Sequence, residues 1–139
     1  MTSTSAPKFF IPESAFSAAE LHNFALLETA FGDTLWEVLR AYIQIGGTAC
    51  EKLQEAVSCA HWQEAVRQSL KIASTAADLD FRAVTHAARA FAASVYEGNT
   101  SGHVRRNAAQ MVIFEFERSC LALESRYPGL AAADETSIA

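Results

Sequence analysis

Apolar residues recur at steps of three and four along successive stretches of this chain, the spacing that places side chains on one face of an α-helix. Only three prolines and six glycines interrupt the 139 residues. The clearest stripe contains Leu35, Val38, Tyr42, Ile45, Ala49, Leu53 and Ala56. The next contains Ala65, Ser69, Ile72, Ala76 and Leu79. A chain with this pattern and so few helix breakers is predicted to be all-α.

Short polar residues predict where the helices begin. Ser17 and Glu20 form a capping box, which indicates a first helix over about 18–30. Asp33 is placed to cap a second, longer helix, and Asp80 is placed to cap a fourth. Each carboxylate would accept hydrogen bonds from backbone N–H groups that lack a partner within the helix.

Glycine and proline predict the remaining breaks. Gly98 suits a left-handed residue after the fourth helix, and Pro128-Gly129 stops the fifth. A third helix follows the break at Cys59-Ala60-His61. Gly46-Gly47 lies inside the second helix, where each glycine costs up to about 1 kcal/mol relative to alanine, so we expect a kink or a close helix approach there.

Four long amphipathic helices with short connections favour an antiparallel four-helix bundle, covered by the additional short N-terminal helix. We expect an N-terminal arm at 1–16, the bundle at 17–128 and a C-terminal tail at 129–139. The predicted core consists of Leu35, Tyr42, Leu53, Ile72, Leu79, Phe91, Ile113, Phe116 and Leu123.

Composition excludes several classes of function. The formal charge is −5 with no block of basic residues, so nucleic acid is not an expected partner. No apolar run approaches a membrane span and no signal peptide precedes the domain, which indicates a cytoplasmic protein. The catalytic and cofactor motifs of the common enzyme classes are missing, so we expect no enzyme and no cofactor. Cys59 and His61 are too few ligands for a metal site, and none is predicted.

The order of the elements resembles the histidine phosphotransfer (HPt) family over roughly residues 20 to 127. The residues that carry this resemblance are Phe31-Gly32-Asp33, a long helix with Ala41-Tyr42-Ile43, the segment 53–57, a break at His61-Trp62 and a helix of small residues. Proteins of that family accept phosphate from the aspartate of a receiver domain on an exposed histidine. A lysine three residues later and a glycine four residues later support that chemistry.

This chain lacks the family's acceptor histidine in both registers that fit. Without gaps, Leu70 stands at the histidine, Ala73 at the lysine and Ser74 at the glycine. A register shifted by two places Gln68 at the histidine and keeps Lys71, with Ile72 at the glycine position. Neither leucine nor glutamine has a nucleophilic nitrogen that could take a phosphoryl group.

The apolar residues of this helix have two interpretations. Val66, Leu70, Ala73 and Ala77 are spaced 4, 3 and 4, so they are either bundle core or an exposed patch. As a patch they would bind a receiver domain or a histidine kinase without phosphate transfer. The predicted partner-binding residues are Val66, Arg67, Leu70, Lys71, Ala73, Ser74 and Ala77.

Two alternatives stay open. A displaced histidine, His86 or His61, could accept phosphate, and His86 has Arg82 and Arg89 within four residues on its helix. The chain could instead be a helical adaptor or a self-associating bundle unrelated to phosphorelays, because four-helix architecture alone does not define a function.

Overall fold

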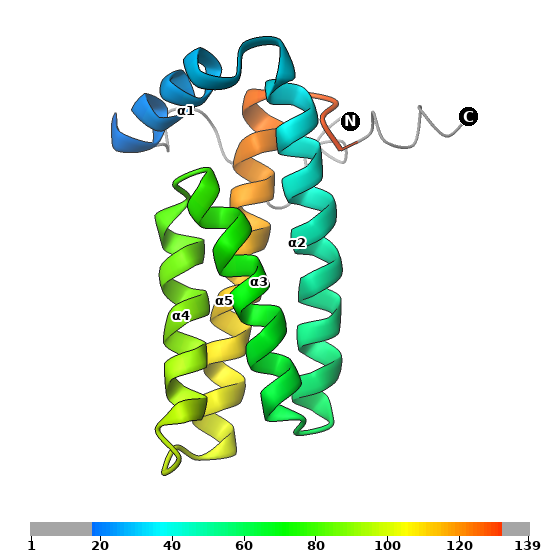
Figure 1. Cartoon of the computed structure of the whole chain (residues 1–139), viewed down its shortest axis with the longest axis vertical. Coiled ribbons are helices and arrows are strands. Elements are labelled where there is room, and N and C mark those ends of the chain that lie inside the picture. The colour runs from blue at the N-terminus through cyan, green and yellow to red at the C-terminus, as the bar shows by residue number, and fades with distance from the viewer. Residues whose placement is uncertain (1–17, 132–139) are drawn as a thin grey trace, which may run out of the picture. The chain divides into compact units, whose positions relative to one another are not determined.

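The computed structural model describes residues 18–131, and every regular element in this range is helical. The α-helices are α1 (Ala18–Phe31), α2 (Leu35–Ser58), α3 (Trp62–Asp78), α4 (Arg82–Tyr96) and α5 (Gly102–Arg126), with a 3-10 turn at Gly32–Thr34 before α2 (Figure 1). The predicted all-α class is confirmed. The predicted arm at 1–16, the cap residue Ser17 and residues 132–139 of the predicted tail lie outside the described residues.

The chain divides into two compact units. One unit is 41–117, and the other contains the described residues 18–40 and 118–131. The predicted functional residues all belong to the first unit, which contains α3, α4 and most of α2 and α5.

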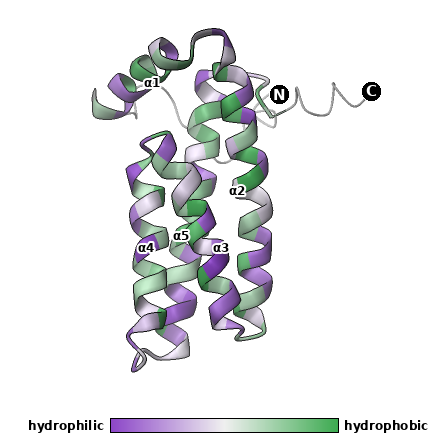
Figure 2. Cartoon of the chain, in the orientation of Figure 1, coloured by the Kyte–Doolittle hydropathy of each residue, from purple (hydrophilic) through white to green (hydrophobic). Residues whose placement is uncertain are grey.

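Within 41–117, specific contacts connect the helices. The buried hydroxyl of Ser69 on α3 donates to the carbonyl of Ala88 on α4 at 2.8 Å. The ring of Tyr42 on α2 packs edge-on against Phe81 and tilted against Phe116 on α5, with centroids 5.1 and 5.2 Å apart. Both apolar and polar residues lie on each of these helices (Figure 2), as expected for helices that bury one face.

The core agrees with the sequence at every position that was predicted for it. All nine predicted core side chains are buried, from Leu53, Ile72, Phe91 and Leu123 with no exposed surface to Leu35 at 7%. On the α2 stripe, Val38 is half-buried and Ile45 is 45% exposed. Ile45 lies about 100° around the helix from Gly46, which is the position that faces α5.

A close helix approach at Gly46 is confirmed. A Cβ atom built on Gly46 would overlap the buried ring of Phe116 on α5, whereas one built on Gly47 would meet nothing within 4 Å. Gly46 is therefore required for the packing of α2 on α5, and Gly47 is not.

Two predicted helix caps are wrong. Asp33 lies inside the 3-10 turn that precedes α2. Asp80 has a left-handed backbone with φ +59°, the residue at the start of α4 is Phe81, and the Asp80 carboxylate instead accepts from Nε of Arg82 at 3.2 Å. Phe81, one residue after Asp80, occupies the N-cap position of α4, so the Asp80 carboxylate is not placed to cap the helix. Gly98, with φ +78°, has the predicted left-handed conformation.

In the unit that contains 18–40 and 118–131, polar and aromatic contacts connect α1 with the end of α5. The phenol of Tyr127 donates to Glu28 at 2.6 Å, and Arg126 reaches the same carboxylate at 3.4 Å. The Arg126 guanidinium also lies over the ring of Phe24. The hydrogen bond from Tyr127 is the largest cause of the lowered pKa of Glu28, while burial and this bond raise the pKa of Tyr127 to about 12.

Candidate functional site

The exposed face of α3 carries five of the seven residues predicted to bind a partner. Leu70 is 42% exposed, so it is a surface residue and not part of the core. Arg67, Lys71, Ser74 and Ala77 are also exposed. These positions lie within about 120° of one another around a helix of 3.6 residues per turn, so they form one continuous surface, which we call the α3 face.

Val66 and Ala73 do not belong to the α3 face. They are only 4% and 3% exposed, so the expectation of one exposed patch that includes them is wrong. Around the helix they lie between Leu70 and Ser69, and Ser69 is the residue that bonds to α4. Val66 and Ala73 are therefore buried on the side of α3 that packs against α4.

The burial of α3 residues can be compared with what each register of the HPt resemblance requires. The ungapped register places the lysine position at Ala73, which is buried, although it leaves Leu70 and Ser74 exposed. The shifted register has an exposed Lys71 but places the histidine position at Gln68, which is 2% exposed. Neither register presents both the acceptor position and the lysine position to solvent.

Gln68 has a structural partner at the start of the helix. Its side-chain amide donates to Glu64 at 2.7 Å, while Arg67 donates to the other oxygen of the same carboxylate through Nε and Nη2 at 3.0 and 2.8 Å. These hydrogen bonds, from Gln68 first and then from Arg67, lower the pKa of Glu64. The carboxylate of Glu64 thus fixes Arg67 at the edge of the α3 face.

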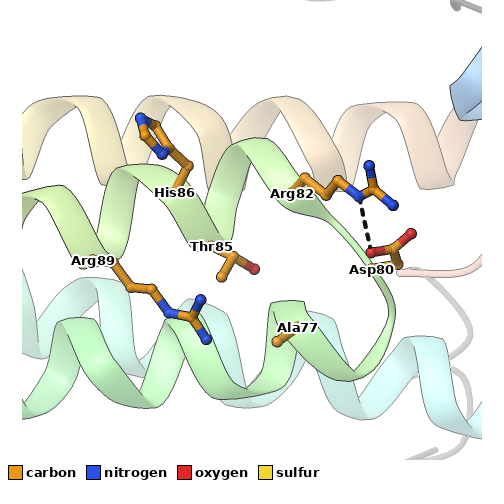
Figure 3. Close-up of a pocket in the computed structure, with 6 residues that line it drawn as sticks. All are labelled: Ala77, Asp80, Arg82, Thr85, His86 and Arg89. Atoms are coloured by element: carbon orange, nitrogen blue, oxygen red, sulfur yellow. Dashed lines mark hydrogen bonds and ion pairs between the residues drawn. The ribbon is translucent and has the colours of Figure 1, made fainter.

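An open hollow of about 320 Å³ lies where α3 meets α4. Its lining residues are Ala77, Asp80, Arg82, Thr85, His86 and Arg89 (Figure 3). The Arg89 side chain extends across the hollow toward Ala77 on α3, with Thr85 beside it. His86 projects away from Arg89. The small side chain of Ala77 leaves this space open.

Cations predominate around the α3 face and the hollow. Arg67 is paired with Glu64 and Arg82 with Asp80. Within residues 18–131, Lys71, Arg89 and the exposed Asp78 form no ion pair, so the free charges beside the α3 face are two positive and one negative. The arrangement is an exposed leucine with small neighbours and flanking cations, which suits contact with an acidic surface.

Metal chemistry gains no support from the geometry of the described chain. Nowhere in 18–131 do three or more His, Cys, Asp or Glu side chains gather as a metal would require. Cys59 and His61 are both exposed at the turn after α2, where Ala60 has φ +57°. None of the described helices is long and apolar enough to cross a membrane.

Comparisons with known proteins give no relative for this chain. No family model, curated protein or solved structure matches it. The likeness to HPt domains therefore stays a prediction from the residues, and function has to be argued from the site itself.

The contribution of α4 to this surface was not part of the predicted partner-binding set. Thr85 and Arg89 are spaced one helical turn apart, and the tight turn at 79–81 brings them beside Ala77. The available signal was the short connection itself, because a short turn pairs the end of one helix with the start of the next.

Proposed function

We propose that this protein is a non-enzymatic, HPt-like adaptor or inhibitor that binds a receiver domain or a histidine kinase without accepting phosphate. The observation that carries this proposal is the exposure of Leu70 among Arg67, Lys71 and Arg89. In this proposal, 41–117 acts as an antiparallel four-helix bundle that displays α3 and α4, and the site of action is cytoplasmic.

The chemistry of the face favours docking over transfer. Receiver domains carry acidic residues around their phosphorylation site, and the exposed cations of α3 and α4 would attract them over a long range. Leu70 and Ala77 supply apolar surface that loses its water on contact. No histidine lies among the exposed residues of the α3 face, so a docked aspartyl phosphate would meet no nucleophile there.

The test is a binding screen by calorimetry against purified receiver and kinase domains, followed by Leu70→Asp on the partner found. An unpaired carboxylate at the centre of the contact should weaken binding at least tenfold. Ile45→Asp is the matched control, because Ile45 is exposed to a similar extent but lies on α2. Both variants must retain their circular dichroism spectra.

The outcomes of this test distinguish docking on the α3 face from contact elsewhere and from an unrelated adaptor role. Loss of binding in Leu70→Asp alone supports docking on the α3 face. Equal affinity of both variants for the partner would place the contact elsewhere, and no binding to any receiver or kinase domain would favour a helical adaptor unrelated to phosphorelays.

Phosphotransfer through a displaced histidine is the second candidate. His86 is exposed and lines the same hollow as Arg82 and Arg89, and its ring would have to turn toward one of these cations for a phosphoryl group on it to be neutralised. His61 lies at a turn and does not line that hollow. Acid-labile label that passes from a phosphorylated receiver to the wild type, and that is lost in His86→Ala, would favour transfer over the adaptor role.

A further inference from the structure

The outer face of α5 carries three large exposed apolar side chains, more than any other helix within 41–117. Val104, Met111 and Phe114 are 47%, 51% and 56% exposed. Steps of seven and three place them on one side of the helix, opposite the buried Ala109 and Phe116. We call these three residues the α5 patch. Met111 and Phe114 lie one turn apart, and the exposed polar Asn107 lies between them and Val104 on the same side.

Along one flank of the α5 patch, the charge of the polar residues changes from positive to negative. Arg106, Gln110 and Glu117 are exposed and lie four and seven residues apart, so they share a flank. The basic group lies toward the start of α5 and the acidic group toward its end. Two antiparallel copies of this helix would place opposite charges of this flank side by side, whereas in two parallel copies the flanks would lie on opposite sides of the contact and would not meet.

We infer that the α5 patch is an interface with a second copy of this chain, in which two α5 helices pack antiparallel about a two-fold axis near Met111. Arg106 and Glu117 are almost equally far from Met111 along the helix, five residues before it and six after it. At about 1.5 Å per residue, a two-fold axis at this level brings Arg106 of each copy beside Glu117 of the other. The two Met111 side chains then meet at the centre, each near Phe114 of the opposite copy.

The size of the contact sets its strength. A pairing built on one helix face falls at the low end of interface sizes, below about 1,200 Å² in total. We therefore expect a concentration-dependent monomer–dimer equilibrium rather than an obligate dimer. The proposed interface is separate from the α3 face, so it does not depend on the function proposed above.

Sedimentation velocity of the full chain across a hundredfold range of concentration tests the interface. The wild type should shift toward dimer as concentration rises, and Met111→Glu should stay monomeric because two carboxylates would be desolvated against each other at the axis. Leu70→Glu is the control, because it places the same charge on an exposed apolar position of α3 and should dimerise like the wild type. A wild type that stays monomeric throughout, or a Met111→Glu variant that dimerises normally, would overturn the inference.

A charge exchange tests the antiparallel orientation. Arg106→Glu and Glu117→Arg should each weaken dimerisation several-fold, and the double variant should recover it because the pairs are rebuilt with their signs reversed. In a parallel dimer these residues would lie on opposite sides of the contact and would not pair, so neither single exchange would weaken dimerisation. Because both positions are exposed, circular dichroism should show the same helix content in all three variants.

Discussion

The close approach of α2 and α5 makes adjacent glycines respond in opposite ways to the same substitution. In Gly46→Ala, the new methyl group would overlap the ring of Phe116, whose side chain is only 4% exposed and is held by Tyr42. In Gly47→Ala, the methyl group would meet no atom within 4 Å. Both changes replace a helical glycine by the best helix former.

Two opposing effects, helix propensity and overpacking, set the expected change in the free energy of unfolding. Replacing glycine by alanine within a helix stabilises by about 1 kcal/mol. Overpacking a well-filled core costs about 1–3 kcal/mol, and at Gly46 the obstacle is a rigid aromatic ring rather than the end of a flexible chain. Gly46→Ala should therefore lower the free energy of unfolding by up to about 2 kcal/mol. Gly47→Ala should raise it by up to about 1 kcal/mol.

A double-mutant cycle isolates the contact with the ring. Phe116→Ala alone should cost about 3–5 kcal/mol, since the ring is almost fully buried. In that background the obstacle is gone, so Gly46→Ala should become neutral or stabilising, while Gly47→Ala keeps its sign. Urea unfolding followed by circular dichroism measures all of these changes. Equal stability of Gly46→Ala and Gly47→Ala in the wild-type background would refute the close approach.

Two further predictions concern burial and pH. Leu70→Asp should cost no more than about 1–2 kcal/mol in urea unfolding, because Leu70 is already partly exposed. Ala73→Asp, one turn further along α3, should cost about 3–5 kcal/mol because it buries an unpaired charge, and similar losses for the two would contradict the assigned faces. The pKa of Tyr127 is raised to about 12 from an ordinary value of 10.0, so the stability that its phenol contributes should be fully present below pH 10 and lost as the pH rises toward 12. Thermal melts of Tyr127→Phe should show a smaller loss over that range, and identical profiles would argue against the bond to Glu28.

Helix identity and core membership could be predicted because both depend on the same periodic burial. The residues spaced 4, 3, 4 and 3 along α3 are buried, and the breaks near residues 60, 80 and 98 are found close to where the sequence suggests them. The caps at Asp33 and Asp80 were predicted wrongly. A carboxylate can cap a helix only if the preceding turn leaves it at the N-cap position, and that geometry depends on how the two helices pack.

The candidate site was only partly predictable for a related reason. Val66, Leu70, Ala73 and Ala77 are equivalent by spacing, but the position of α4 buries Val66 and Ala73 and leaves the others at the surface. One sequence spacing fits both arrangements, because an apolar stripe of this width can straddle the boundary between core and solvent. The packing direction that decides between them is set by contacts such as Ser69 with Ala88, which the residue pattern of α3 does not contain.

The net charge of the whole chain differs in sign from the net charge of α3 and α4, which carry the proposed docking surface. The chain carries 11 basic and 16 acidic residues, but 62–96, which contains α3 and α4, has four basic residues (Arg67, Lys71, Arg82 and Arg89) and three acidic ones (Glu64, Asp78 and Asp80), so its charge is +1 and that of the remainder is −6. Two of those three acids are already paired with Arg67 and Arg82. An acidic partner would thus be attracted by the net positive charge of this hairpin and repelled by the net negative charge of the remainder, which favours docking on α3 and α4. An acidic average charge is therefore compatible with an acidic partner, provided that the contact is confined to α3 and α4.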